Sequence, residues 1–535
     1  MYHPSISTPQ LQSASISRLL DEYYRYQGRR YVPSPSLLRY TNQFLNTPWP
    51  TGSIRRYSTS IHILDDDSLI HVFYLYRLVH LGGDEDDILD LGGNGVRERW
   101  WYKLAQICRR WRSIILGSAS YLGLRLVCTN GTPVVDMLAH SPPFPLIIDF
   151  IHKHHDRDIA AEDEEGMIFA LQQRNRVRSI HLRMPVRSLQ RFIIAIDEEY
   201  PMLESLVTLH PTGDNGPNLI LPQTFQAPHL RRLALSGFAF PIGSPFLTTA
   251  VGLVTLRLYL AHPSAYLQPR ALLQYLSTIP QLETLVIGFS FAVPNRDVER
   301  QLLRVPIRIH VTFPNLRYFT FQGVRAYLEA LVHCITTPRL EKLGIVLFNQ
   351  LTFPLPGLLQ FMKATESLRF HSATFEFSNM SIRVVMYPRD AGEKWAFRMD
   401  VDCVQVEWQV SSVAQIFNAL SQALFSVEHL TLKVGRGNLS PGLKWRHKVD
   451  RTEWRRLLRS FDNVKTLFVD YPLVADLSRC LRLEGGDLPL ELLPELQELV
   501  YSGISIGHAF DPFIDSRRNA GRPVTLVRRA QAHAV

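Results

Sequence analysis

The chain has 535 residues, 46% of them hydrophobic, and a formal net charge of +9 at pH 7. This length and composition indicate a globular protein made of several domains or of one long repeat array. No apolar run approaches the roughly 18 residues that a membrane span needs, and the opening MYHPSISTPQ lacks the layout of a signal peptide. We therefore expect no membrane association and a cytoplasmic or nuclear location.

The positive charge is concentrated at the two ends of the chain. Residues 1–60 hold seven arginines against two acidic residues, and residues 516–535 hold five arginines and no acid. A nucleic-acid-binding protein usually gathers its charge on a folded face, so this distribution disfavours nucleic acid as a partner. One alternative nevertheless stays open: a repeat scaffold that binds nucleic acid or an acidic partner through its arginine-rich ends, with a steep dependence on salt.

Five cysteines are spread along the chain, the nearest two twenty residues apart, and there is no Cys-x-x-Cys. Such spacing favours neither a disulfide framework nor a structural zinc site. We expect the cysteines to be small buried side chains in a reducing compartment.

The first folded elements are expected after residue 60. Residues 1–60 are rich in Ser, Pro, Tyr and Arg and predict a disordered arm. Residues 61–80 predict a helix with three aspartates before its apolar run, where they would favour the helix dipole. The segment 81–99 is acidic between two glycine-rich ends and predicts a loop.

The segment 100–115, WWYKLAQICRRWRSII, follows directly. Trp100, Leu104, Ile107, Trp111 and Ile114 recur at steps of 4, 3, 4 and 3, and lysine, glutamine and arginine occupy the opposite face. This spacing predicts an amphipathic helix, or two short helices in succession. Core packing and a docking surface explain the apolar side of this segment equally well.

A pattern of the form L-x-x-L-x-L recurs after residue 128. Its copies begin at Val177, Leu203 (partial), Leu230, Leu253, Leu282, Leu316, Leu340, Val427, Val464 and Leu496. The distances between neighbouring copies up to Leu340 are 26, 27, 23, 29, 34 and 24, and a gap of 87 follows. Within the gap the weaker candidates begin at Leu368 and Trp395. Periods of this size predict a solenoid of stacked strand and helix units, which cannot bury their apolar faces singly.

The pattern resembles the strand portion of a leucine-rich repeat. The asparagine that usually follows eight residues after the first leucine is absent: Phe238, Ser290 and Val324 stand in its place. We therefore expect an irregular, degenerate leucine-rich-repeat-like solenoid over residues 131–505, followed by a basic tail, 506–535.

The segments 64–78 and 100–115 together resemble an F-box, with LDDD at 64–67 as its opening and ICRRW at 107–111 as its ending. The stretch after it, RSIILGSASYLGLRLVCTNGTPV, is similar to the region that follows the F-box in many fungal F-box proteins. Two departures affect docking: Asp65 stands where the family has proline, and the loop 81–99 lengthens the module. The fold class expected is thus α/β, a short all-α F-box module over residues 61–130 followed by the solenoid.

This resemblance implies a non-enzymatic substrate-recognition subunit of a Skp–cullin–F-box ubiquitin ligase, without cofactor or metal. The module would dock on a Skp-type adaptor, and through it on a cullin–RING ligase, while the repeats capture a protein substrate for ubiquitin-dependent degradation. The residues expected at the adaptor interface, some of which must instead form the core of the module, are Leu64, Leu69, Ile70, Val72, Phe73, Leu104, Cys108 and Trp111. Replacing Ile107 and Trp111 by charged residues is expected to abolish adaptor binding. The substrate has no signature in the sequence.

Patterns that suggest catalysis or metal binding each have a simpler explanation. Gly503 to Gly507 fit G-x-S-x-G, but the short, proline-containing remainder cannot supply a helix and the rest of a triad. The histidine cluster IHKHHDRD at 151–158 would need a distant fourth ligand and a dry pocket to bind a metal, so a solvated loop or strand end explains it better. The acidic run 84–87 lacks the order of a calcium loop. No catalytic residue is predicted.

Overall fold

The computed structural model describes residues 64–81, 98–151, 159–209, 219–239, 244–260, 266–289, 307–348, 355–365, 368–378, 381–389, 394–403, 406–420, 424–435, 450–482, 490–502 and 508–529. The predicted arm 1–60 and most of the predicted loop 81–99 lie outside these residues. Contacts divide the chain at residue 65, and everything from Asp66 onward forms one compact unit. None of the helices within the described ranges has the length and apolar character that a bilayer span requires.

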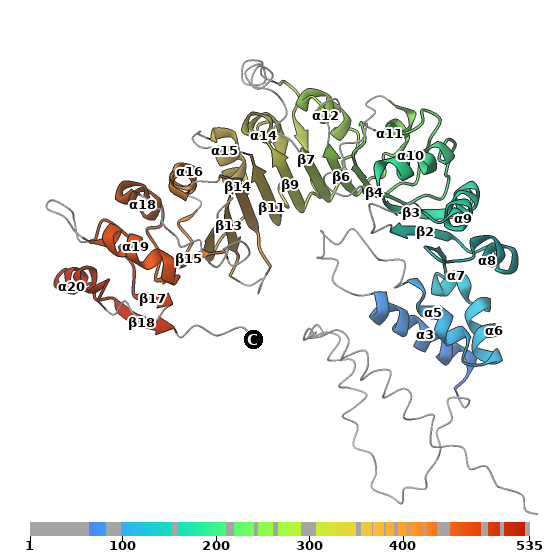
Figure 1. Cartoon of the computed structure of the whole chain (residues 1–535), viewed down its shortest axis with the longest axis horizontal. Helices are drawn as coiled ribbons and strands as arrows, with labels where there is room; N and C mark the ends of the chain where they lie inside the picture. The colour runs from blue at the N-terminus through green and yellow to red at the C-terminus, as the bar shows by residue number, and fades with distance from the viewer. Residues whose placement is uncertain are drawn as a thin grey trace, which may run out of the picture. The chain divides into compact units, whose positions relative to one another are not determined.

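Short helices make up the N-terminal part of this unit, and strands alternate with helices after it (Figure 1). The helices are α3 (Asp66–Leu81), α5 (Trp100–Ala105), α6 (Arg109–Gly117), α7 (Ala119–Leu122), α8 (Val134–His140), α9 (Ala161–Gln172), α10 (Val186–Ala195), α11 (Pro245–Thr249), α12 (Pro269–Leu276), α14 (Arg325–Val332), α15 (Pro356–Ala364), α16 (Val406–Ala419), α18 (Arg451–Leu458), α19 (Val474–Leu481) and α20 (Asp511–Asn519), with a 3-10 turn at Tyr471–Leu473.

The strands of the main sheet are β1 (Leu126–Cys128), β2 (Leu146–Ile151), β3 (Val177–Arg183), β4 (Ser205–Leu209), β5 (Arg232–Ser236), β6 (Thr255–Leu260), β7 (Thr284–Phe289), β9 (Tyr318–Gly323), β11 (Lys342–Leu347), β12 (Ser372–Phe377), β13 (Ser381–Tyr387), β14 (Phe397–Asp402), β15 (His429–Val434), β16 (Thr466–Val469), β17 (Glu498–Ser502) and β18 (Thr525–Arg529). A separate parallel pair joins β8 (Val311–Thr312) to β10 (Ile335–Thr336). In Figure 1 the helices that alternate with the strands, from α9 to α20, lie along one side of the main sheet.

The main sheet has sixteen strands within the described residues, and most neighbours are parallel and consecutive in the chain. The first leucine of the repeat pattern lies in the bend before a strand, and the next two lie on the strand itself. Leu230, Leu233 and Leu235 are buried in this way, and Leu233 stands in register with Leu256 of the next strand. Burial of a leucine side chain stabilises the fold by about 1.5–3 kcal/mol. The predicted solenoid of stacked strand and helix units is confirmed.

The gap of 87 residues in the repeat pattern contains an unexpected interruption of the parallel order. Strands β12, β13 and β14 are joined by antiparallel pairing, and the spatial order is β11-β14-β13-β12-β15. The weak candidate at Trp395 leads into β14, which takes the place beside β11. The candidate at Leu368 precedes β12, which pairs with β15 instead. A repeat pattern cannot reveal this order, because it reports burial along each strand and not which strands are neighbours.

The sheet extends beyond residues 131 and 505, the two boundaries that the sequence predicted for the solenoid. Strand β1 precedes residue 131 and pairs with β2. Helix α20 and strand β18 lie within the expected basic tail, and β18 pairs with β17. Arg517 is fully buried there and donates to the main-chain oxygens of Pro494 and Leu496. This arginine closes the last repeat and is not available to a polyanion.

Aromatic side chains fill the space between the sheet and the helices in the centre of the solenoid. Phe289, Phe321 and Tyr327 are buried with their rings in contact, and the Tyr327 hydroxyl donates to the main-chain oxygen of Leu267 at 2.7 Å. Burial raises the pKa of Tyr327 well above its ordinary value. Phe289 and Phe321 are therefore core residues.

Candidate protein-docking surface

The N-terminal helices form a small module with a core of its own. The spacing in segment 100–115 allowed one amphipathic helix or two short ones. The segment folds as two helices, α5 and α6. Phe73 of α3 packs edge-to-face on Trp111 of α6 with ring centroids 4.9 Å apart. Leu69, Ile115 and Leu122 complete this core and are fully buried. The first turn of α3 carries Asp66 and Asp67, as predicted.

Polar contacts fix the ends of these helices. Arg110 at the start of α6 donates through Nε and Nη2 to Asp66 Oδ1, at 3.0 and 2.7 Å, which places the loop before α6 beside the beginning of α3. Cys108 is the residue before α6, and its Sγ accepts from the backbone N–H of Trp111 at 3.4 Å. Cys108 therefore acts as a helix cap, a role that serine or aspartate usually fills.

The same module is attached to the first strand of the sheet. Arg99 donates to the main-chain oxygen of Val127 at 3.3 Å, and the Tyr102 hydroxyl accepts from the N–H of Val127 at 3.4 Å. Burial raises the pKa of Tyr102, so that its hydroxyl keeps its proton at neutral pH. Strand β1 in turn pairs with β2. A fragment of the chain that ended near residue 135 would contain β1 but not β2, so β1 would lose its neighbour in the sheet.

The residues predicted at the adaptor interface occupy three different environments. Leu69, Phe73 and Trp111 are buried in the module core. Ile70, Leu104 and Cys108 are half-buried. Leu64 and Val72 are exposed. A charged residue in place of Trp111, which is only 7% exposed, would disrupt the core and could not test docking, so Ile107, at 58% exposed, is the informative half of that pair.

A strip of exposed aliphatic side chains runs along α3 on the side opposite Leu69 and Phe73. Its members, the α3 strip below, are Val72, Leu75, Leu78 and Val79. Leu75 and Val79 are 57% and 56% exposed, and the spacing of three and four residues places them on one helical face. A helix that is apolar all round is normally buried on all sides. Here one side is covered by α5, α6 and α7, and the other is open to solvent.

Three members of the strip, Leu75, Leu78 and Val79, are absent from the residues expected at the adaptor interface, because those were chosen by their resemblance to the F-box pattern. A signal was nevertheless present: in the run VFYLYRLVHL, residues 72–81, Arg77 and His80 are the only basic side chains among eight hydrophobic ones. An exposed apolar patch of this kind is characteristic of a protein-interaction site.

A second group of polar residues lies on the sheet face near β2, β3 and β4. The Nε2 of His181 lies 2.9 Å from Ser179 Oγ and 3.1 Å from Ser205 Oγ, and Asp149 occupies the register position beside it. Asp149 and His181 line a shallow surface depression that is too small to enclose a water molecule. One nitrogen serves two serines, and the backbone N–H groups of these strands are bound in the parallel ladder, so they are not available as oxyanion-hole donors beside the hydroxyls. This group fits a structural role.

The remaining charged row on the sheet neutralises itself. Asp400, Arg383, Glu376 and Lys433 stand in register on β14, β13, β12 and β15, with alternating sign. The closest N···O distances are 2.7 Å for Arg383 and Asp400, 3.9 Å for Arg383 and Glu376, and 3.5 Å for Lys433 and Glu376. Opposite charges directly across strands stabilise a sheet, so this row holds the inserted strands together and presents no net charge to a ligand.

The other predicted functional patterns lie outside the described residues. These are the G-x-S-x-G stretch at 503–507, the histidines at 152–155 and the acidic run at 84–87. The five cysteines are all free, four of them buried, as expected. Burial raises the pKa of both Cys128 and Cys480 to about 12.

Comparison with known proteins adds little to this geometry. No protein-family model and no curated protein matches the chain. Among solved structures, the crystal structure of a TLR13–ssRNA13 complex is 11% identical over 76% of this chain and 46% of its own, with a TM-score of 0.29. The leucine-rich repeat-containing protein LegL7 from Legionella pneumophila is also 11% identical, over 76% of this chain and 91% of its own, with a TM-score of 0.23. TM-scores this low do not establish a shared architecture, so the repeat fold rests on the strand register described above.

Proposed function

We propose that this protein is an F-box substrate receptor, which docks on a Skp-type adaptor of a cullin–RING ubiquitin ligase through the α3 strip. The observation that carries the proposal is the open apolar side of α3, in a module that also has the Cys-Arg-x-Trp ending at 108–111. The repeat fold fits the second half of the proposal, since a solenoid offers an extended surface for another protein. Within this proposal the protein acts by proximity, raising the local concentration of a bound substrate near the ubiquitin carrier.

The size of the strip suits a protein partner better than a small ligand. Val72, Leu75 and Val79 follow one line along the helix, and Leu78 widens it. Apolar anchors at i, i+3 and i+7 are typical of a helix face that packs against another protein. Ile107, in the loop next to the start of α3, adds a further exposed apolar side chain on the same module.

The alternative function was binding of a polyanion through the arginine-rich ends of the chain. The contacts of the C-terminal arginines weaken this alternative. Arg517 is buried, Arg518 pairs with Asp515 at 3.1 Å, and Arg522 pairs with Glu495 at 3.2 Å. Three of the five arginines in the expected tail therefore have partners within the fold.

The test uses the full chain and a purified Skp-type adaptor. Leu75→Asp combined with Val79→Asp places two charges on the strip without touching the Phe73–Trp111 core. We expect at least about 100-fold weaker adaptor binding, because charges in a desolvated apolar contact are costly. The matched control is Ile194→Asp with Val251→Asp, two exposed aliphatic residues of the repeat region, 67% and 53% exposed, which should leave binding unchanged.

Biolayer interferometry at two salt concentrations measures the affinity, and circular dichroism checks that each variant is folded. An apolar interface should depend only weakly on salt, in contrast to binding driven by phosphate contacts. A folded Leu75/Val79 variant that binds the adaptor as tightly as the unmodified chain would refute the assignment of the strip. A wild-type chain that does not bind would refute the proposed function.

A further inference from the structure

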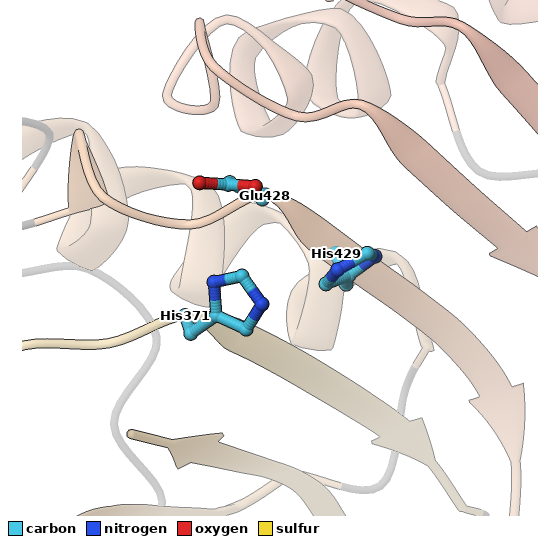
Figure 2. Close-up of side chains that lie close together, drawn as sticks. All are labelled: His371, Glu428 and His429. Atoms are coloured by element: carbon cyan, nitrogen blue, oxygen red, sulfur yellow. The ribbon is translucent and has the colours of Figure 1, made fainter. Parts of the chain in front are cut away.

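Two histidines and a glutamate gather where β12 and β15 begin. His371 immediately precedes β12, Glu428 immediately precedes β15, and His429 is the first residue of β15. One ligand atom from each of the three lies within 4.8 Å of the others. Figure 2 shows the two imidazole rings and the carboxylate grouped at these strand ends.

The backbone holds the three residues close together before any ligand binds. The N–H groups of Glu428 and His429 both donate to the main-chain oxygen of His371, at 2.9 and 3.2 Å. The two imidazole rings lie edge-to-face with centroids 4.8 Å apart. Only side-chain rotation is then needed to bring the ligand atoms to one point, and none of the three side chains belongs to the apolar core.

Two imidazole nitrogens and one carboxylate oxygen form a donor set that suits zinc, with water in the open fourth position. At zinc–ligand distances of about 2.1 Å, ligand atoms in a tetrahedron lie about 3.4 Å apart. The present spacing exceeds this by no more than about 1.4 Å, which is within the reach of small χ rotations. We propose that His371, Glu428 and His429 bind a zinc ion that links β12 to β15.

Two cations oppose the metal and supply a sharp test. Arg389 Nη2 lies 2.8 Å from Glu428 Oε1, and Lys465 Nζ lies 3.0 Å from Glu428 Oε2. A carboxylate has about four lone-pair positions, so each oxygen can accept one of these bonds and still bind a metal. Their positive charges nevertheless repel zinc, and removal of one of them should tighten binding.

The position of the site suggests what the ion would do. Strand β12 belongs to the antiparallel insertion, and it pairs in parallel with β15, where the regular repeats resume. Ser372 and His429 are register partners at the first position of this pairing. A metal bound here would clamp the insertion to the following repeat at the end where the strands enter the sheet.

The experiment titrates zinc chloride into the full chain by isothermal calorimetry. All variants carry His152→Asn, His154→Asn and His155→Asn, which remove the separate histidine cluster. We expect His371→Ala and His429→Ala each to weaken zinc binding more than about 100-fold, since each removes a direct ligand, a larger change than the 10–100-fold cost of losing an outer-shell partner. Lys465→Met should strengthen binding several-fold.

The control variant is His229→Ala, an exposed histidine outside the three-residue group, which should leave the affinity unchanged. Cobalt as a spectroscopic substitute should show no thiolate charge-transfer band, because no cysteine belongs to the site. Saturable binding that is lost in both histidine variants and tightened by Lys465→Met supports the site. No saturable binding to the parent chain, or histidine variants that bind zinc as tightly as the parent chain does, overturns it.

Discussion

Helices α3 and α10 both carry many apolar side chains, but only α10 buries most of them within the fold. Helix α10 buries Val186, Leu189, Phe192 and Ile193 against the sheet and leaves Ile194 exposed. Helix α3 buries Leu69 and Phe73 and leaves the four members of the α3 strip in solvent. The two helices have similar apolar content, so composition alone does not separate them.

The difference lies in what surrounds each helix. In the repeat region neighbouring units cover each other's apolar faces, because the units stack in a line and every strand of the main sheet, except the two at its ends, pairs with a strand on either side. The N-terminal module has three short helices to cover α3, and they reach only one side of it. A patch of apolar side chains that the fold does not cover is typical of an interaction site. Four experiments test this difference between the two regions.

The largest expected effects come from core truncations in the two regions. Phe73→Ala in the module and Trp454→Ala in the repeats each remove a fully buried aromatic side chain, and each should cost about 3–5 kcal/mol of stability. Differential scanning calorimetry of the full chain measures both. Trp454 packs on Phe377 in the repeat core, so its variant should lower the main transition. If Phe73→Ala has no effect on any transition, the module does not possess the core described here.

The next effect concerns the charged row of the inserted strands. Asp400 is largely buried and accepts from Arg383 at 2.7 Å and from Arg398 at 2.8 Å. Asp400→Ala leaves both guanidinium groups without this acceptor, and we expect a loss of about 1–3 kcal/mol in urea unfolding. Glu341→Ala is the control, since Glu341 forms an exposed pair with Arg317 at 3.8 Å and such pairs contribute less than about 1 kcal/mol. Equal losses in the two variants would contradict the structural role of the row.

A pH effect is expected from His181. Burial lowers its pKa in the folded state, with Asp149 opposing and Arg232 assisting the shift. The unfolded chain, with an ordinary histidine pKa near 6.5, then binds a proton more readily than the folded one. The stability contributed by neutral His181 is therefore present above about pH 6.5 and is lost as the pH falls through the folded-state pKa.

Thermal midpoints measured across this pH range test the effect, with His181→Gln as the comparison. The variant keeps a polar side chain beside Ser179 and Ser205 but cannot titrate. Its midpoint should fall less between pH 7.5 and 5.5 than that of the unmodified chain. Parallel curves for the two proteins would show that His181 does not contribute to the acid sensitivity.

The smallest effect on stability should come from the α3 strip itself. Leu75→Gln with Val79→Gln changes only exposed positions, so the free energy of unfolding should stay within about 0.5 kcal/mol of the original per site. The same change at buried Leu189 should cost several times more. A large loss of stability in the Leu75/Val79 variant would mean that the strip is covered within the chain, and would end the contrast between α3 and α10.

Much of the repeat fold follows from the sequence because burial along a strand has a local signature. The copies that begin at Leu253 and Leu282 became β6 and β7, and the helical run between them became α12. The weak candidates at Leu368 and Trp395 precede β12 and β14, but the pattern predicted neither β13 nor the order of the three strands, since strand order depends on which edges meet in space. It also ended before β18, because a basic stretch with five arginines gives no sign that one of them, Arg517, is buried.

The candidate site divides in the same way. The sequence by itself determined that residues 64–78 and 100–115 form apolar helices, because the periodic spacing of large side chains fixes one face for the core. Only the tertiary structure decided that Phe73 and Trp111 belong to that core while Leu75 and Val79 remain in solvent, and that His371 meets His429 across two strands. The physical reason is that burial and proximity between distant residues depend on how elements pack, whereas periodicity records only that an apolar face exists.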